Sequence, residues 1–383
     1  MSNFTIEMLP AQKGDCLWIE YGDPPAVHRM IIDGGTSPTF REAMKDRIEN
    51  LSSDQLQFDL LIVTHVDIDH IGGVLKLLEE HRGLGIEFDD VWFNAFVDPA
   101  DLPSAGDELL GYIEGEILTE QLRSSGWPWN EAFDGKAVCV PDGGATLPSC
   151  RLRGGMTLTL LSPTPRELGL LRRNWDQVVR DAGLVPGVPG DPLAEMAHRR
   201  GIKLADEDLL LGADVPGDST IDVEALADSP FVPDRSVPNA SSIAVVAEFE
   251  GKRCLLAGDA YSPVMEASLE RWNKDAHTDP LALDALKMPH HGSGGNITNG
   301  LLGMVSCSRY LFSTNGANFG ASPGHPDEEA VARVLCHGRS GNSEPILYFN
   351  YRSDRNGKWD SENLMARHGY SVVFPPEGWV IEL

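Results

Sequence analysis

Long hydrophobic runs, an N-terminal signal and paired cysteines are all missing from this 383-residue sequence. No apolar stretch approaches the ~20 residues that a membrane-spanning helix requires, so we expect no membrane insertion. The opening residues, Met1 to Glu7, contain neither a basic start nor an apolar signal core, which predicts a cytoplasmic protein. The six cysteines form no Cys-x-x-Cys pair. They indicate reduced, mostly buried thiols rather than a zinc knuckle or a disulfide framework.

Basic residues are scarce as well. The chain has 31 Lys and Arg against 58 Asp and Glu, a formal net charge of −27. A protein that grips long nucleic acid normally presents a basic surface, because phosphate neutralisation supplies most of that affinity. Two features reduce the conflict: bound divalent cations offset charge locally, and residues 204–234 carry nine Asp or Glu and no Lys or Arg. The composition therefore favours a small substrate without excluding a nucleic acid.

What the sequence does contain is a dense group of metal-ligand residues. The apolar run Phe58–Thr64 predicts a buried strand, and His65, Asp67, Asp69 and His70 follow it at once. Side chains at this spacing converge on one point in a turn, whereas a helix or a strand directs them to different faces. The segment therefore predicts a metal site at the end of this strand.

Strands and helices alternate along the rest of the chain. Gly72 and Gly73 open the helix that follows the ligands, and glycine there allows another backbone to approach the site closely. The aromatic residues of Gly126-Trp127-Pro128-Trp129 fit two interpretations. They could be exposed and stack on bases, or they could be the packing residues of a lid, which is the interpretation that we prefer. The predicted strands cover residues 4–9, 16–21, 29–33, 58–64, 86–96, 156–161, 242–249, 253–257, 282–288, 309–313, 344–351 and 370–374. The predicted helices cover residues 38–51, 71–81, 109–122, 166–181, 194–202, 262–272, 297–305 and 327–337.

The segment His65-Val-Asp67-Ile-Asp69-His70 resembles the His-x-His-x-Asp-His signature of the metallo-β-lactamase fold. Its His-x-Asp-x-Asp-His form is similar to that of the hydrolase domain of the competence protein ComEC and its stand-alone relatives. The resemblance implies an α/β fold, a four-layer αββα sandwich, as one domain over residues 1–383 with insertions at about 100–152 and 184–235. Further segments match in order: Gln12-Lys-Gly14-Asp15-Cys16, Ile31-Ile-Asp33-Gly34-Gly35, Asn239-Ala-Ser241-Ser242, Leu255-Leu-Ala-Gly258-Asp259-Ala260, Leu286-Lys287-Met-Pro-His290-His291-Gly292-Ser293 and Gly324-His325-Pro326.

The resemblance also implies two metal ions. Site one would take His65 and Asp67, site two would take Asp69, His70 and a histidine of the last turn, and Asp259 would bridge them. Of the two histidines in that turn we favour His291, because it precedes Gly292, as the final ligand often does in the wider fold. Asp33 is expected to orient a ligand or the backbone, although a direct ligand or substrate role stays open.

Two departures from the family pattern affect the metals. Asp67 replaces a histidine, and oxygen ligands shift preference from Zn²⁺ towards Mn²⁺ or Mg²⁺. The third histidine of site one is missing, since only Asn239-Ala-Ser241-Ser242 stands in that region. The sequence leaves three possibilities for site one: it binds its metal weakly, it has an open coordination position, or it is filled only when substrate binds.

The expected chemistry is hydrolysis by a metal-activated water. Asp69 would orient the water, and His325 or His290 would protonate the leaving oxygen, although His325 also fits a simple capping turn. Lys287, Ser293 and Asn239 are candidates for substrate binding. Lys287 could equally extend from its strand into solvent, and Ser293 could be a helix N-cap.

The function implied by the resemblance is a phosphodiesterase, most directly a nuclease acting on DNA or RNA. The alternative is a hydrolase of a small ester, thioester, lactone or cyclic nucleotide, which the acidity favours. A non-catalytic module is disfavoured because no ligand of site two is lost. The sequence identifies no protein partner.

Overall fold

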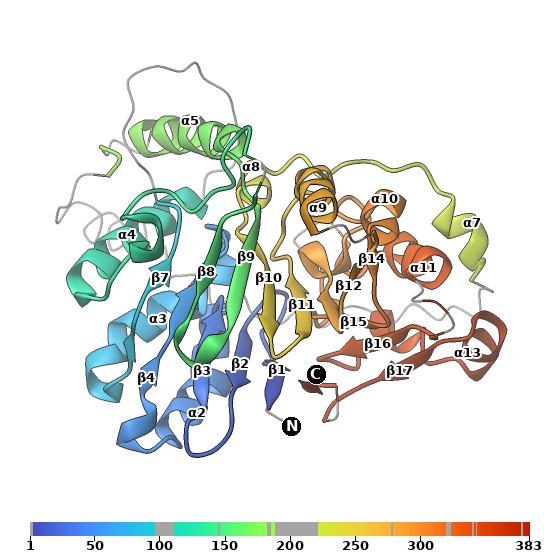
Figure 1. The fold of residues 1–383 in the computed structure, drawn as a ribbon, viewed down its shortest axis with the longest axis horizontal. Helices are drawn as coiled ribbons and strands as arrows, with labels where there is room; N and C mark the ends of the chain where they lie inside the picture. The colour runs from blue at the N-terminus through green and yellow to red at the C-terminus, as the bar shows by residue number, and fades with distance from the viewer. Residues whose placement is uncertain are drawn as a thin grey trace.

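The computed structural model describes residues 3–95, 111–144, 146–181, 185–187, 221–276, 279–318, 323–338, 341, 343–376 and 378–383. The helix predicted over residues 194–202 lies outside this part of the chain. Two large sheets form the centre of the molecule (Figure 1). The six-stranded sheet has the order β18-β1-β2-β3-β5-β7, and the eight-stranded sheet has the order β17-β16-β15-β13-β11-β10-β9-β8.

The strands of the two large sheets are short, and all except β8 and β18 lie close to predicted strands. The six-stranded sheet contains β1 (Phe4–Met8), β2 (Leu17–Tyr21), β3 (His28–Ile32), β5 (Leu60–Ile62), β7 (Val91–Trp92) and β18 (Val380–Glu382). The eight-stranded sheet contains β8 (Ser149–Arg151), β9 (Thr157–Ser162), β10 (Ala244–Phe249), β11 (Lys252–Leu256), β13 (Ala285–Lys287), β15 (Arg309–Phe312), β16 (Ile346–Phe349) and β17 (Ser371–Val373). Two small sheets pair β4 (Gln57–Phe58) with β6 (Glu87–Phe88) and β12 (Leu281–Ala282) with β14 (Val305–Ser306).

Helices cover the outer face of each sheet. In Figure 1, α3 and α4 lie beside the N-terminal sheet, and α9, α10 and α11 lie on the opposite side of the molecule. The helices are α1 (Ser37–Thr39), α2 (Lys45–Glu49), α3 (Ile68–Leu84), α4 (Gly111–Ser125), α5 (Pro165–Asp181), α7 (Val223–Ala227), α8 (Val237–Ala240), α9 (Ser262–Ala276), α10 (Asn299–Gly303), α11 (Glu328–His337), α12 (Asp354–Gly357) and α13 (Glu362–His368). A π-helical turn, Phe40–Met44, joins α1 to α2.

Three separate hydrophobic clusters correspond to the three interfaces of a four-layer sandwich. One contains Ile19 and Leu256, which come from different sheets, so it fills the space between the sheets. Leu61 of β5 packs with side chains of α3, α4 and α5 in the second cluster, and Leu255 of β11 packs with those of α9, α10 and α11 in the third. Adjacent residues of one strand thus face different layers, as strand geometry requires. The predicted αββα sandwich is confirmed.

Three predicted strands are each divided at an aspartate. Asp59 separates β4 from β5, and its carboxylate accepts hydrogen bonds from His28 Nδ1 at 2.9 Å and Arg153 Nε at 2.9 Å. Asp90 separates β6 from β7 and accepts bonds from the amides of Val91 and Glu131. Buried carboxylates with several donors fix irregular backbone that an apolar pattern alone does not reveal. The predictions of unbroken strands over 58–64 and 86–96 are therefore wrong. The strand predicted over 282–288 is divided into β12 and β13 at Asp284, so that prediction is wrong as well.

The tryptophans of the first insertion pack against other side chains, and neither is fully exposed to solvent. Trp127 is buried and its ring lies 4.9 Å from that of Phe88 in an edge arrangement. Trp129 is half-buried, and its Nε1 donates to the carbonyl of Phe93 at 3.0 Å. The preferred interpretation, a segment packed by its own tryptophans, is borne out over the described residues 111–144.

Two further expectations concern cysteines and membranes. The thiols of all six cysteines are free, and Cys16, Cys254 and Cys307 are buried. Within the described ranges, none of the helices combines the length and the apolar character that crossing a bilayer demands.

A buried acid in α4 gives a prediction about stability. Glu114 is 5% exposed and its Oε2 has no hydrogen-bond partner. Burial raises its pKa from 4.5 to about 7, partly offset by a backbone hydrogen bond. Because the native state holds this proton more tightly than the unfolded chain, stability falls as pH rises from the unfolded to the folded pKa, by up to about 3 kcal/mol. Glu114→Gln should raise the free energy of unfolding at pH 8 and change it little at pH 5, measured by chemical denaturation.

The control for this prediction is Glu131→Gln, which neutralises an exposed acid of the same insertion. It should change stability little at either pH. An equal effect of Glu114→Gln at pH 5 and pH 8 would contradict a role for ionisation, because the cost of burying the charge exists only above the raised pKa.

Candidate metal centre

Turns after several strands bring the ligand-type residues to one edge of the sandwich. His65 and Asp67 lie between β5 and α3, Asp259 follows β11, and His290 and His291 follow β13. Asp69 and His70, however, lie in the first turn of α3, which begins at Ile68. The prediction that all four ligands of the signature share a turn, with the helix starting only at residue 71, is wrong. The side chains converge nevertheless, because the two helical residues sit at the very start of α3.

Glycines bring the end of β3 against the start of α3. The amide of Gly34 donates to the carbonyl of His70 at 2.8 Å, and the amide of Gly73 donates to the carbonyl of Gly35 at 3.0 Å. A Cβ on Gly73 would lie 2.0 Å from the Gly34 carbonyl oxygen, a contact that no larger residue tolerates. This close approach sets Asp33 beside His70.

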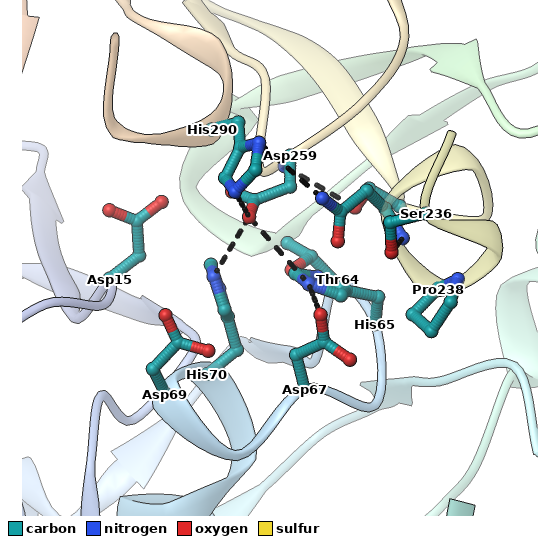
Figure 2. A network of polar contacts seen from close by, with 12 residues as sticks. Asp15, Thr64, His65, Asp67, Asp69, His70, Ser236, Pro238, Asp259 and His290 are labelled. Carbon is teal, nitrogen blue, oxygen red and sulfur yellow. Dashed lines mark hydrogen bonds and ion pairs between the residues drawn. The ribbon is translucent and has the colours of Figure 1, made fainter. Parts of the chain in front are cut away.

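Asp259 lies among four imidazoles, and Figure 2 shows three of them, His65, His70 and His290, around its carboxylate. Its Oδ2 is 3.4 Å from Nε2 of His70, 3.6 Å from Nε2 of His291, 3.7 Å from Nε2 of His290 and 3.8 Å from Nε2 of His65. Its Oδ1 is buried and has no hydrogen-bond partner. Burial raises the pKa of this carboxyl, but the surrounding histidines outweigh it and hold the pKa well below the usual range.

Two of these imidazoles direct lone pairs at each other. Nδ1 of His70 donates to Asp33 Oδ2 at 2.8 Å, and Nδ1 of His291 donates to the carbonyl of Ser313 at 3.0 Å. A neutral imidazole that donates from Nδ1 has an acceptor at Nε2. The two Nε2 atoms are 3.3 Å apart, an arrangement that a shared proton or a cation stabilises. This donor set suits a divalent metal ion.

Asp33 orients two histidines through one carboxylate. It accepts hydrogen bonds from the Thr64 amide at 2.8 Å, from Thr64 Oγ1 at 2.7 Å and from His70 Nδ1. Since the Thr64 hydroxyl donates to Asp33, its oxygen accepts from Nδ1 of His65 at 3.0 Å. His65 Nε2 is buried without a hydrogen-bond partner, free to bind a cation. Such buttressing of ligand histidines is what the sequence led us to expect of Asp33.

Asp15 belongs to this cluster, and the sequence analysis gave it no role. One ligand atom each of Asp15, His70, Asp259 and His291 lies within 4.8 Å of the others. A Cβ on Gly14 would lie 1.6 Å from the Asp69 carbonyl oxygen, so glycine is required for Asp15 to reach the site. The signal available in the sequence was the Gly14-Asp15 pair in the first turn.

Lys287 is the ion-pair partner of Asp15. Both side chains are buried, and Nζ of Lys287 contacts Oδ2 of Asp15. Burial raises the pKa of Asp15, but Lys287 and then His291 outweigh it and hold the pKa below the ordinary value. The structure thus directs Lys287 into the interior, an arrangement different from both the phosphate contact and the extension into solvent considered above.

The centre is open on one side. The side chains of His65, His70 and His291 are 0% exposed, whereas those of Asp67, His290 and Asp69 are 34%, 21% and 15% exposed. Solvent therefore reaches the centre past these three side chains.

Three further candidate residues lie around His290. The ring of His325 is centred 4.7 Å from that of His290, and its Nδ1 lies 3.4 Å from Asp327 Oδ1. Burial lowers the pKa of His325, partly offset by Asp327. Asn239 is buried, with its amide directed at Asp234. Ser293 is buried as well, and it is not a helix N-cap, because Thr298 caps α10.

Comparisons with known proteins agree with this geometry. Residues 15–132 match the sequence model of the Metallo-beta-lactamase superfamily. No curated protein matches the chain. Among solved structures, the metallo-beta-lactamase fold protein YhfI from Bacillus subtilis is 10% identical with a TM-score of 0.40, with 100% of both chains covered. A CmlA beta-hydroxylase E377D mutant is 11% identical with a TM-score of 0.37, covering 100% of this chain and 53% of that chain.

The mixed α/β arrangement of two sheets and flanking helices is consistent with the metallo-β-lactamase sandwich, and residues 15–132 are similar in sequence to that superfamily. The similarity over residues 15–132 and the buried His and Asp cluster together indicate a metal-dependent hydrolase.

Proposed function

We propose that this protein hydrolyses phosphodiester bonds, in DNA or RNA, with two divalent cations. The observation that carries the proposal is the set of four imidazole Nε2 atoms arranged around the Asp259 carboxylate, with further carboxylates beside them. Two metals spanned by one carboxylate are a common arrangement in enzymes that cleave phosphate esters.

The protein ligands divide into two groups that meet at Asp259. His65 Nε2 lies 3.6 Å from Asp67 Oδ2, which defines site one, and His291 Nε2 lies 3.6 Å from Asp69 Oδ2, which with His70 defines site two. Carboxylate oxygens contribute to both groups. We therefore propose Mn²⁺ or Zn²⁺ as the metals, with Mg²⁺ as a further candidate.

The chemistry follows from the residues at the open side. Cations held by these residues would lower the pKa of a water to near neutrality and stabilise the anionic oxygens of a phosphoryl transition state. In this proposal the Asp69 carboxylate accepts a hydrogen bond from the attacking water. As the water oxygen bonds to phosphorus and the P–O bond breaks, His325, whose ring lies 4.7 Å from that of His290, protonates the leaving oxygen, a role typically worth about 10²- to 10⁴-fold in rate.

A small-molecule substrate is the second candidate. The net charge of −27 opposes binding of a long polyanion and favours a small ester, thioester, lactone or cyclic nucleotide. The resemblance of the His65–His70 segment to ComEC-type hydrolases supports the nucleic acid. The two candidates share the same metal chemistry and differ in what the open side must accommodate.

The distinguishing experiment supplies polymer and small substrates together. The purified protein, stripped with a chelator and reloaded with Mn²⁺ or Zn²⁺, is incubated with single- and double-stranded DNA, RNA, bis(p-nitrophenyl) phosphate, a cyclic nucleotide and carboxylic esters. We expect metal-dependent cleavage of a nucleic acid and of the small diester. Cleavage of small substrates alone would refute the nuclease, and hydrolysis of carboxylic esters alone would refute phosphodiesterase activity altogether. The chelator-treated protein is the control.

A further inference from the structure

We infer that His290 is the third protein ligand of metal site one and that Asp234 and Asn296 position it there. The inference rests on the two-metal centre of the proposed function. It supplies the ligand that the sequence lacks at the usual place, and it removes His290 from consideration as a proton donor.

The backbone after β13 is shaped to present two successive imidazoles. His290 (φ 46°, ψ 53°) and His291 (φ 54°, ψ 15°) both adopt left-handed conformations, and Gly292 follows with φ 93°. Non-glycine residues with positive φ are uncommon, and two in succession are a sign of a constrained functional turn. The amide of His290 donates to the Gly258 carbonyl at 3.0 Å, which anchors the turn beside Asp259.

The ring of His290 is held in the orientation of a metal ligand. Asn296 Nδ2 donates to the Asp259 carbonyl at 3.1 Å and to Asp234 Oδ2 at 3.2 Å, so the oxygen of this amide faces His290. Nδ1 of His290 therefore donates to Asn296 Oδ1 at 3.0 Å. The lone pair of Nε2 is then directed at the Asp259 carboxylate, as in His70 and His291.

Asp234, the last residue of the acidic segment 204–234, also contacts His290. It is 13% exposed, and its Oδ2 lies 3.4 Å from His290 Nδ1 and accepts from Asn239 Nδ2 at 2.8 Å. A Cβ on Gly295 would lie 2.9 Å from the Asp234 amide nitrogen, so this glycine lets the segment reach the site. Asn239, a candidate for substrate binding, thus holds the Asp234 carboxylate in place through this hydrogen bond.

The assignment to site one follows from what already surrounds site two. Asp15, His70, Asp259 and His291 form a compact cluster. Neither His65 nor His290 belongs to this cluster, yet the Nε2 atoms of both lie within 3.8 Å of Asp259 Oδ2. Site one then has His65, Asp67, His290 and Asp259, and site two has Asp69, His70, His291 and Asp259. Each ion receives two imidazoles and two carboxylates, and Asp15, which pairs with Lys287, lies beside site two as a further carboxylate.

Metal stoichiometry tests this assignment without a substrate. Chelator-stripped protein is titrated with Zn²⁺ and with Mn²⁺ by calorimetry, and bound metal is counted by elemental analysis after desalting. The wild type should bind two ions, and His290→Ala and His65→Ala should each bind one. The double variant His65→Ala/His290→Ala should still bind one, because both side chains serve the same site. Circular dichroism verifies folding, and His290→Gln replaces the alanine variant if that variant fails to fold.

The control variant is His337→Gln at the exposed end of α11, which should retain two ions. Asp234→Asn should weaken only the site that His290→Ala abolishes, by about 10- to 100-fold in affinity. Two ions bound to His290→Ala, with slower turnover, would overturn the inference and assign His290 to proton transfer. Loss of both ions in the double variant would place His290 in site two. If the stoichiometries hold but no phosphodiester is cleaved, the proposed function fails while the assignment stands.

Discussion

Replacement of Asp259 by asparagine should reduce turnover of a phosphodiester by at least about 10³-fold, because in the proposed centre this carboxylate is the group that both metal sites share. Its Oδ2 lies within 3.8 Å of four imidazole nitrogens. Asparagine preserves the shape of the side chain and removes its charge. Steady-state rates with bis(p-nitrophenyl) phosphate, together with elemental analysis of the desalted protein, measure the loss of activity and of metal.

Asp284→Asn is the matched control for Asp259→Asn. Asp284 stands just before β13, pairs with Lys252 and accepts from the Arg253 amide at 2.9 Å. It is thus an aspartate associated with the same strands at their opposite end, away from the metal ligands. Its neutralisation should leave the rate close to that of the wild type. An Asp259→Asn protein within tenfold of the wild-type rate would contradict a shared-carboxylate centre.

The second large effect concerns stability in the absence of metal. Lys287→Met should lower the free energy of unfolding of chelator-treated protein by about 3–5 kcal/mol, since it leaves the buried Asp15 charge without its partner. Added Zn²⁺ or Mn²⁺ should restore part of this loss, because a cation beside Asp15 again compensates the charge. Chemical denaturation with and without metal measures both effects.

Two further variants test the cause of that loss. Lys287→Met/Asp15→Asn should recover much of the stability, because the uncompensated charge is gone. Lys252→Met breaks the Lys252–Asp284 pair, whose lysine is 47% exposed, and should cost less than about 1 kcal/mol. If the double variant is no more stable than Lys287→Met, the loss comes from packing of the methionine rather than from the charge of Asp15.

The parts of the site that the sequence revealed are those encoded within a few residues. His65, Asp67, Asp69 and His70 follow a strand in one short segment, so the local pattern located them, whereas Asp259 was predicted from the resemblance to the metallo-β-lactamase fold. The structure brings these residues together as expected, and it places Asp33 against His70. The fold could be predicted for the same reason. Apolar residues recur along the sequence with the period of a strand or of a helix, and this period shows which element each segment forms.

The parts that the sequence did not reveal depend on contacts between distant residues. Lys287 meets Asp15 across 272 positions, and nothing local to either residue signals the other. His290 and His291 are neighbours of the same type, and only the left-handed backbone turns both rings towards Asp259. The edge strand β18 was not predicted, because its pairing with β1 joins opposite ends of the described chain. The divided strands at Asp59 and Asp90 reflect hydrogen bonds that override an apolar pattern.

The shared carboxylate of Asp33 has a consequence for how the centre fills. It accepts from His70 directly and from His65 through the Thr64 hydroxyl, and in the proposed centre these two imidazoles belong to different metal sites. An ion that fixes one ring also limits the motion of the other ring. The first binding step therefore reduces the conformational entropy that is lost when the second ion binds. Occupancy of the two sites is thereby thermodynamically linked, with the second ion bound more tightly than the first.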